Sequence, residues 1–372
     1  MKIHIKTIAI ILLAAITIFL LKKDYFTIQF NKFRINYISN NDINYHDATQ
    51  FTIYGSLTKD LKRFDKIKGF EYISTTSTGV SIAFRTNSTR IALKWENDNI
   101  APFHSMSLLC RAGIDLYQYK DSSFVYVASA IPDNEIFNCS EALDFMDNSE
   151  KIFLINLPTY SEVSKLEIGV DNGSYIEKQE VLDSERKIII YGSSITQGSS
   201  PSRPGLSYPN ILSRSLEREV INVGFSGLGL FDLEMLPFLA GIDSKEIVLE
   251  CVPNTTLDNV EGHASQFIEG LLKQGKRVYL VEGFIRENVS LFNNDFDKKS
   301  KAYTEVRNKL LFEIYEKLKQ QDADIVWIDN SCFDSVHDFT ADGVHLNDIG
   351  HMILAEHIIK AFASDMDLKP NN

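Results

Sequence analysis

The stretch Ile188-Ile-Ile-Tyr191-Gly-Ser-Ser194-Ile-Thr-Gln-Gly198 decides the fold of the second half of the chain. It changes within a few residues from a continuous apolar run to small and polar residues. A short continuous apolar run is typical of a strand buried on both faces, as in a parallel sheet. The glycine and serines that follow place a hydroxyl on a tight turn at the carboxyl end of this strand. A serine there needs a neighbouring base, because its free hydroxyl is a poor nucleophile. The alternative is a Ser/Gly loop that only turns the chain.

The region after Lys187 repeats this strand pattern, with apolar runs at 220–223, 247–249, 278–281 and 325–328. Helical spacing lies between and after these runs. One expected helix face carries Val306, Leu310, Leu311, Ile314 and Leu318, and another carries Ile349, Met352 and Ile353. Alternating strands and helices predict a three-layer α/β domain over 185–365. Ligands are then expected beyond the carboxyl ends of the strands.

The preceding region has a period of two instead. Apolar residues alternate along 80–85 and along 91–96, and the polar stretch 86–89 between them predicts a β-hairpin. Further strand-like runs lie at 123–131, 151–157 and 166–170. We therefore predict an antiparallel, jelly-roll-like β-sandwich domain over 27–180, with the domain boundary in the polar stretch 171–187.

Composition supports a folded protein of two domains. The chain has 372 residues, of which 44% are hydrophobic and 24% charged, with only 19 glycines and 9 prolines. These values exclude a disordered, collagen-like or polytopic membrane protein. The formal net charge of −12 argues against nucleic acid as a partner, because phosphate would be repelled.

The first 26 residues are expected to be an export signal or an N-terminal membrane anchor. Residues 7–21 are uncharged and mostly apolar, and Lys2 and Lys6 precede them. Lys22 and Lys23 follow directly, with no small-residue cleavage site. Cleavage and retention of this leader therefore both remain open. Either route predicts an exported protein, whether periplasmic, secreted or at the cell surface, with possible membrane attachment through 7–21.

The four cysteines predict no metal site. Cys110, Cys139, Cys251 and Cys332 form no C-x-x-C pair, which disfavours structural zinc. Cys110 and Cys139 lie in the same half and could form a disulfide in an exported protein. Free buried thiols are the alternative.

The candidate base lies near the other end of the chain, in Ala341-Asp342-Gly-Val-His345-Leu-Asn347. The three-residue spacing lets the Asp342 carboxylate reach one ring nitrogen of His345, leaving the other nitrogen to accept a proton from Ser194. Asn347 is expected to cap the following helix. The alternative is an exposed turn with an incidental histidine. His337, His351 and His357 compete for the role but lack the Asp-x-x-His spacing.

Two more loops follow strands at the same predicted sheet edge. Gly227 follows the second strand and Asn254 follows the third. Acyl transfer needs donors that face the developing oxyanion. The backbone N–H groups of Ser194 and Gly227 and the side-chain amide of Asn254 can supply them. Taken singly, a turn glycine and a loop cap are the simpler interpretations.

These residues resemble the SGNH (GDSL-type) hydrolases, whose four signature residues match Ser194, Gly227, Asn254 and His345 in order. The resemblance covers about 185–365 and implies a flavodoxin-like hydrolase domain. The string Gly113-Ile-Asp115-Leu-Tyr117 is similar to the Gly-x-Asp-Leu-Tyr motif of a bacterial subgroup with an extra N-terminal β domain.

The resemblance implies Ser194 as nucleophile, His345 as base, Asp342 as its orienting carboxylate, and an oxyanion hole of Ser194, Gly227 and Asn254. It implies no cofactor and no metal. Two departures from the broader family are evident. Ser193 stands where an aspartate usually precedes the nucleophile, and Pro253-Asn254 replaces the usual Gly-x-Asn-Asp.

The expected activity is hydrolysis of short-chain esters, acetyl esters above all, on a small ester or an acetylated polysaccharide. Four aromatic residues of the N-terminal half, Trp95, Phe103, Tyr117 and Tyr119, either stack on sugar rings or pack in the core. The alternatives are an exported lipase or acyltransferase acting on another envelope substrate, and a catalytically idle carbohydrate-binding surface protein.

Overall fold

The computed structural model describes residues 25–30, 33–38, 42–55, 75–98, 100, 103–133, 136–286 and 295–367. The expected leader at 7–21 lies outside these residues. Within the described ranges, no helix combines the length and the apolar character needed to cross a membrane.

The second half of the chain contains a five-stranded parallel sheet with the order β14-β13-β15-β16-β17. Its strands are β13 (Asp183–Gly192), β14 (Arg218–Gly224), β15 (Glu246–Glu250), β16 (Arg277–Val281) and β17 (Ile325–Ile328). Numbered along the chain, this order is 2-1-3-4-5, the flavodoxin-like order. The predicted α/β fold is confirmed, and all five apolar runs form its strands.

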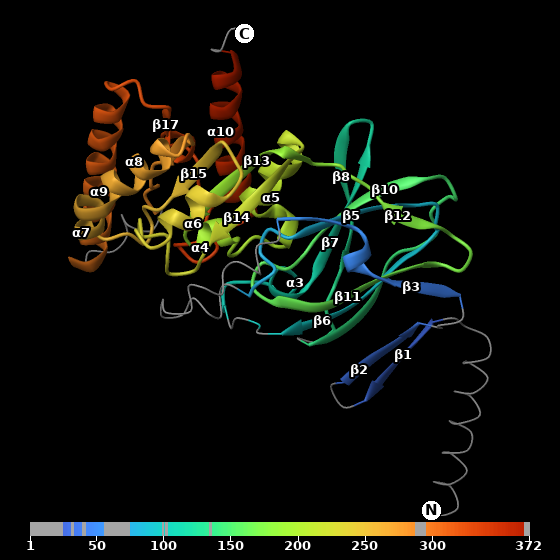
Figure 1. Ribbon diagram of the computed structural model, residues 1–372. Helices are drawn as coiled ribbons and strands as arrows, with labels where there is room; N and C mark the ends of the chain where they lie inside the picture. The colour runs from blue at the N-terminus through green and yellow to red at the C-terminus, as the bar shows by residue number, and fades with distance from the viewer. Residues whose placement is uncertain are drawn as a thin grey trace, which may run out of the picture.

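Helices cover both faces of this sheet (Figure 1). Side chains of α6 (Leu236–Gly241), α8 (Ser265–Lys273) and α9 (Asp295–Lys319) pack on one face. Side chains of α5 (Tyr208–Leu216) and α10 (Asp348–Asp367) pack on the other. The short helices α4 (Ser194–Gln197) and α7 (Leu257–Asn259) follow β13 and β15. The three layers are therefore helix, sheet and helix.

The predicted helix faces are partly wrong. Leu311 and Leu318 of α9 are buried, but Val306 is 43% exposed. In α10, Ile349 and Met352 are 48% and 46% exposed, whereas Ile353 packs against the core as predicted, beside the buried Leu354, Ala355, Ile358 and Phe362. The predicted face came from the first turn of α10, whereas the sheet contacts its later turns.

The first half forms two antiparallel sheets that face each other, which confirms the predicted sandwich. One sheet has the order β12-β5-β10-β7-β8, with β4 also paired to β5, and the other has the order β3-β11-β6-β9. The strands of the first are β4 (Thr52–Tyr54), β5 (Ser81–Thr86), β7 (Ile114–Lys120), β8 (Ser123–Ala130), β10 (Lys151–Asn156) and β12 (Ile176–Lys178). Those of the second are β3 (Ile43–Asp47), β6 (Ile91–Asp98), β9 (Phe137–Leu143) and β11 (Glu162–Asp171). A separate pair joins β1 (Tyr25–Phe30) to β2 (Phe33–Ile38).

The predicted hairpin at 80–96 is wrong, although both of its strands exist. β5 pairs with β10 in one sheet and β6 pairs with β11 in the other, so the chain crosses the sandwich between them. Asp171 holds the crossing by accepting hydrogen bonds from the side chains of Ser88, Thr89 and Arg90. Phe84 and Leu93 face the same core from opposite sheets. An alternating pattern marks a buried face but does not say which sheet holds the strand.

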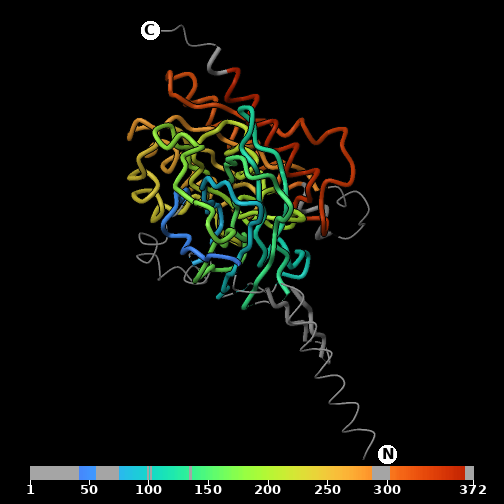
Figure 2. Tube along the Cα trace, turned by 90° about the vertical axis from the view of Figure 1, so that its right-hand side faces the viewer, coloured from blue at the N-terminus to red at the C-terminus, as the bar shows by residue number. Residues whose placement is uncertain are grey.

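The sandwich lies beside the α/β layers (Figure 1), and the two overlap in the view turned by 90° (Figure 2). A short helix of the sandwich, α3 (Leu108–Ala112), contacts the 3-10 turn Pro204–Leu206 of the α/β part. The division into domains at 27–180 and 185–365 remains a prediction about independent folding units.

Candidate active site

Ser194 begins α4, directly after β13 ends at Gly192. The Ser193 side chain caps this helix by accepting a hydrogen bond from the Ile195 backbone N–H at 3.1 Å. Gly198 ends the helix with a left-handed φ of 99°, a conformation that glycine adopts without strain. The Ser194 side chain thus sits on a tight turn at the carboxyl edge of the parallel sheet, as the sequence predicts, and the residue is 7% exposed.

The loop before α10 brings His345 to this serine. His345 Nε2 lies 3.1 Å from Ser194 Oγ, and His345 Nδ1 lies 2.8 Å from Asp342 Oδ2. The other oxygen of Asp342 accepts hydrogen bonds from the backbone N–H groups of Val344 and His345. Asn347 accepts hydrogen bonds from the backbone N–H groups of Ile349 and Gly350, so it caps α10 as expected.

The electrostatics of this series fix its proton positions. Burial raises the pKa of Asp342, but hydrogen bonds from His345 and Val344 outweigh it and lower that pKa to about 2. The carboxylate is therefore ionised at neutral pH and accepts a hydrogen bond from the Nδ1–H group of His345. In neutral His345 this leaves the Nε2 lone pair facing Ser194 Oγ, the arrangement a general base requires.

The predicted oxyanion donors lie on two neighbouring loops. Asn254 Nδ2 donates one of its two hydrogens to the Leu228 carbonyl at 2.8 Å. This hydrogen bond joins the Asn254 loop to the Gly227 loop. The Ser226 N–H donates to Gln197 Oε1 at 2.8 Å, which ties the Gly227 loop to α4. Within the described residues, neither the Ser194 N–H nor the Gly227 N–H forms a hydrogen bond. Both remain available to a bound oxyanion.

The N-terminal region reaches the same site. The Phe103 ring lies edge-on to the His345 ring, with 5.0 Å between centroids, and also contacts the Tyr160 ring at 5.1 Å. Of the other aromatics singled out in the sequence, Trp95 and Tyr117 are buried in the protein. Tyr119 donates a hydrogen bond to Glu217 at 3.0 Å. The sequence gives no local signal that Phe103 would contact the histidine.

Asp115, from the Gly-x-Asp-Leu-Tyr string, holds the loop that follows α4. Its Oδ2 accepts hydrogen bonds from Arg203 Nη1 at 2.9 Å and from the Gly205 N–H at 2.8 Å, and its Oδ1 accepts one from Asn156 at 3.0 Å. The Tyr117 hydroxyl lies 2.6 Å from Arg203 Nη1. We call these five residues the Asp115 clamp. The motif therefore ties the sandwich to the part of the chain that carries Ser194.

Glu250 is a residue of this site that sequence reasoning missed. It ends β15, is 4% exposed, and its Oε2 accepts hydrogen bonds from Ser193 N at 3.0 Å, Ser193 Oγ at 2.7 Å and Thr196 Oγ1 at 2.9 Å. Burial raises the pKa of Glu250 to about 7, although the hydrogen bonds from Ser193 and Thr196 lower it. A charged residue closing an apolar strand at the ligand-binding edge was the available signal.

Two of the three competing histidines, His351 and His357, have other partners. His351 is buried, and its Nδ1 accepts a hydrogen bond from the Tyr208 N–H at 3.2 Å while its Nε2 lies 2.9 Å from the Ser199 carbonyl. His357 Nε2 lies 3.4 Å from Asp329. Burial lowers the pKa of His351 to about 4, so this ring is a neutral structural group.

The cysteines and acidic residues add no metal site. All four cysteines are free thiols, so Cys110 and Cys139 form no disulfide. In the described ranges, no group of three or more histidine, cysteine and acidic side chains could hold a metal ion.

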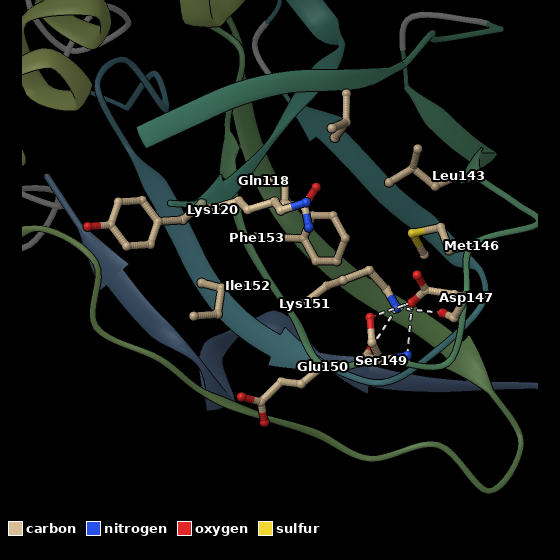
Figure 3. Close-up of a pocket in the computed structure, with 12 residues that line it drawn as sticks. Gln118, Lys120, Leu143, Met146, Asp147, Ser149, Glu150, Lys151, Ile152 and Phe153 are labelled. Atoms are coloured by element: carbon tan, nitrogen blue, oxygen red, sulfur yellow. Dashed lines mark hydrogen bonds and ion pairs between the residues drawn. The ribbon is translucent and has the colours of Figure 1, made fainter. Parts of the chain in front are cut away.

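A separate hollow of about 440 Å³ opens in the sandwich (Figure 3). Its lining includes Gln118, Tyr119, Met146 and Phe153, and Lys151 donates hydrogen bonds there to Asp147 and Ser149. Tyr119, one of the four aromatics that could stack on sugar rings, lies in this lining, and none of the lining residues belongs to the predicted triad or oxyanion hole.

Comparisons with known proteins match both halves of the chain. Residues 185–363 match the model of the GDSL-like lipase/acylhydrolase family, and residues 43–176 match the GxDLY model, the N-terminus of Esterase_SGNH_hydro-type. No curated protein matches the sequence.

Solved structures share the whole two-part fold. A GDSL-like lipase from Bacteroides ovatus is 29% identical, with a TM-score of 0.79 over 89% of this chain and 100% of that one. The salicylyl-acyltransferase SsfX3 of a tetracycline biosynthetic pathway is 15% identical, with a TM-score of 0.63 over 93% and 99%. A family two carbohydrate esterase from Cellvibrio japonicus is 14% identical, with a TM-score of 0.54 over 87% and 98%.

Proposed function

Given that this chain belongs to the SGNH/GDSL-type hydrolases, we propose that it hydrolyses short-chain esters, acetyl esters on carbohydrates above all, through an acyl-serine at Ser194. The series of contacts from Ser194 Oγ to His345 Nε2 at 3.1 Å and from His345 Nδ1 to Asp342 at 2.8 Å carries this proposal. It is the arrangement that turns a weak hydroxyl into a nucleophile.

In the first half of the reaction, His345 Nε2 takes the Ser194 proton while Oγ attacks the ester carbonyl. The oxyanion that forms accepts hydrogen bonds from the N–H groups of Ser194 and Gly227 and from the free N–H of Asn254. The carbon–oxygen bond to the alcohol then breaks, and the alcohol leaves with the proton from Nε2. Asp342 stays ionised and stabilises the imidazolium in between.

In the second half, water replaces the alcohol. His345 Nε2 takes one proton from the water as its oxygen attacks the acyl carbonyl. The acyl–Oγ bond breaks, the acid leaves, and Ser194 regains its proton from Nε2. If another alcohol replaced water here, the same acyl-enzyme would be an acyltransferase, and this is the second candidate function.

The surroundings of Ser194 favour a small acyl group. The serine is 7% exposed, the Phe103 ring packs against His345, and the Tyr160 hydroxyl donates to the Ser194 carbonyl at 3.5 Å. The likeness to a carbohydrate esterase and to an acyltransferase shows a shared fold, so the acceptor must be decided by experiment.

The test compares wild type with Ser194→Ala, using labelling by a fluorophosphonate probe and hydrolysis of p-nitrophenyl acetate. We expect the variant to lose labelling and turnover while keeping its melting temperature. Substantial turnover by the variant would reject Ser194 as nucleophile, and an unlabelled wild type would favour the idle carbohydrate-binding alternative.

The substrate class needs two further measurements. In a series of p-nitrophenyl esters from two to twelve carbons, kcat/KM should be highest for the shortest acyl groups. A maximum at eight carbons or more would contradict the acetyl assignment and favour a lipase. Acetate release from acetylated xylan, mannan and pectin, with and without added alcohols, then separates hydrolysis from transfer.

We also propose that the protein is exported, because residues 7–21 have the length and apolar character of an export signal or anchor. Mass spectrometry of the N-terminus of the cell-derived protein, together with fractionation, tests this. Intact protein confined to the cytosol would contradict it.

A further inference from the structure

The buried carboxylate of Glu250 contacts the nucleophile turn on both sides of Ser194. Its Oε2 accepts from the backbone and side chain of Ser193, before the nucleophile, and from the side chain of Thr196, after it. One atom on β15 therefore fixes the turn that leaves β13. The Thr196 hydroxyl extends this network to the Tyr208 hydroxyl on α5, at 2.6 Å.

The hydrogen bonds of Glu250 affect the orientation of Ser194 through Ser193. Its hydroxyl donates to Glu250 and accepts from the Ile195 N–H, while its carbonyl accepts from the Gln197 N–H at 3.0 Å. Because a peptide group is planar and trans, a Ser193 carbonyl that points into α4 makes the Ser194 N–H point the other way. Fixing Ser193 thus orients the Ser194 N–H away from the helix, where an oxyanion could accept it.

The packing around this carboxylate is tight. A Cβ added to Gly192 would lie 2.8 Å from Glu250 Oε2 and 2.2 Å from Thr196 Oγ1. Only a residue without a side chain lets β13 approach the carboxylate so closely. Small displacements of Glu250 must therefore move the turn itself.

We propose that Glu250 is a positioning residue for the nucleophile: its carboxylate, supplied by the neighbouring strand, holds the Ser193–Thr196 turn so that Ser194 Oγ meets His345 and the Ser194 N–H faces the oxyanion. This inference rests on the proposed role of Ser194. Ser193 occupies the position where the broader family has an aspartate, and here the acidic group lies across the sheet edge instead.

Two ionisable side chains lie next to Glu250, and neither loses its proton near neutral pH. Its ionisable neighbours are Tyr208 on α5 and Cys251, the next residue in the chain, and burial raises the pKa of each well above its ordinary value. The hydrogen-bond donors to Glu250 are the Ser193 N–H and the hydroxyls of Ser193 and Thr196, none of which titrates. Among these contacts, Glu250 is therefore the group that can change its charge near neutral pH.

The experiment moves the carboxylate from one strand to the other. Glu250→Gln keeps an acceptor of the same shape but removes the charge. Ser193→Asp places a second carboxylate against the first, which disfavours ionisation of both. In the double variant, the amide introduced at position 250 can donate to the carboxylate introduced at position 193, and that carboxylate can still cap the Ile195 N–H.

The readouts are the rate constant for fluorophosphonate labelling of Ser194, and kcat and KM for p-nitrophenyl acetate, each per folded molecule. Misplacement of a reacting group by about 1 Å costs roughly 100-fold in rate, so we expect Glu250→Gln to lower kcat by about 10- to 100-fold with little change in KM. Ser193→Asp should lose at least as much. The double variant should recover to within about 10-fold of wild type, far above the product of the two losses.

Glu219→Gln is the matched control. Glu219 is also buried, accepts a hydrogen bond from the Gly55 N–H at 2.9 Å, and lies near the opposite end of β14 from the site. It should leave kcat and labelling unchanged. Melting temperatures of all variants separate lost packing from lost positioning.

Three outcomes would overturn the inference. The first is a Glu250→Gln variant that is labelled and turns over as fast as wild type. The second is a double variant no faster than the product of the single losses, and the third is a loss explained wholly by unfolding. If wild type itself is not labelled at Ser194, the proposed function fails first, and the role of Glu250 falls with it.

Discussion

The Ser194 site and the Asp115 clamp are both polar clusters at the junction of the two halves, but they use their hydrogen bonds differently. In the clamp, the Asp115 side chain is 0% exposed and both of its oxygens are occupied. In the site, the side chains of His345 and Asp342 are 16% and 30% exposed, and two backbone donors remain unused. Side chains whose donors and acceptors are all paired stabilise the contact between two elements. Catalysis instead needs donors and acceptors that a substrate can still use.

This contrast predicts that substitutions in the site change rate, and that substitutions in the clamp change stability. The largest effect on rate is expected for His345→Ala. Loss of the base should lower kcat by about a million-fold, as in other serine hydrolases that lose their histidine. The melting temperature should change little, because the ring is partly exposed. Turnover of p-nitrophenyl acetate checks the first expectation and thermal unfolding the second. A His345→Ala variant that unfolds more easily, but keeps its kcat per folded molecule, would contradict the contrast between the site and the clamp.

Asp342→Asn should have the next largest effect on rate. An amide at 342 can no longer hold the proton on His345 Nδ1, so kcat should fall by about 100- to 10,000-fold.

In wild type, the pKa of the Asp342 carboxyl is lowered to about 2. The stability linked to its ionised form is thus complete above its ordinary pKa near 3.8 and is lost as the pH falls toward 2. Wild-type activity should therefore show no loss from Asp342 between pH 8 and pH 5. A kcat profile over that range, combined with circular dichroism, tests both points.

Asp115→Asn should produce the opposite result. The amide would place N–H groups against the donors of Arg203 and Gly205, and breaking a buried pair of this kind costs about 3–5 kcal/mol of unfolding free energy. Turnover per folded molecule should stay within about threefold of wild type, because Asp115 contacts none of the reacting groups. Urea unfolding and active-site titration measure the two quantities separately. A stable variant with a large loss in kcat would show that the clamp belongs to the site.

The smallest effect is expected for His351→Gln, and it should appear only as the pH falls. The folded protein holds the pKa of His351 at about 4, against 6.5 for a free histidine. Between these two pKa values, His351 binds a proton in the unfolded chain but stays neutral in the folded chain. Its contribution to the free energy of unfolding is therefore complete above pH 6.5 and is lost as the pH falls toward 4. The loss is about 3 kcal/mol for this one group. Between pH 7 and pH 4, the free energy of unfolding of the variant, measured by urea titration, should fall by about 3 kcal/mol less than that of wild type. Identical pH slopes for both proteins would contradict a neutral His351.

The strands of the parallel sheet and the Asp342–His345 loop were predictable because their signals are local. Apolar runs mark the strands, and a three-residue spacing joins the carboxylate to the imidazole. The hairpin prediction failed because alternation along β5 and β6 does not encode their pairing, which is with the distant strands β10 and β11.

The contacts of Glu250, Phe103 and Asp115 were out of reach for the same reason. Each lies in an element whose local pattern explains it without the site: a strand end, a loop and a motif. Their roles come from partners distant in the chain, such as Ser193 for Glu250 and His345 for Phe103. Pattern analysis finds the residues of the proposed triad, but it misses most of the side chains that contact them.

The contact between Phe103 and His345 has a consequence for protein engineering. A shortened gene that begins near residue 181 would encode all the residues that react but would leave one flank of the imidazole open to water. It would also expose the guanidinium of Arg203, which is now shielded by Asp115 and Tyr117. The N-terminal region is therefore better regarded as part of the surroundings of the proposed active site than as a detachable targeting module.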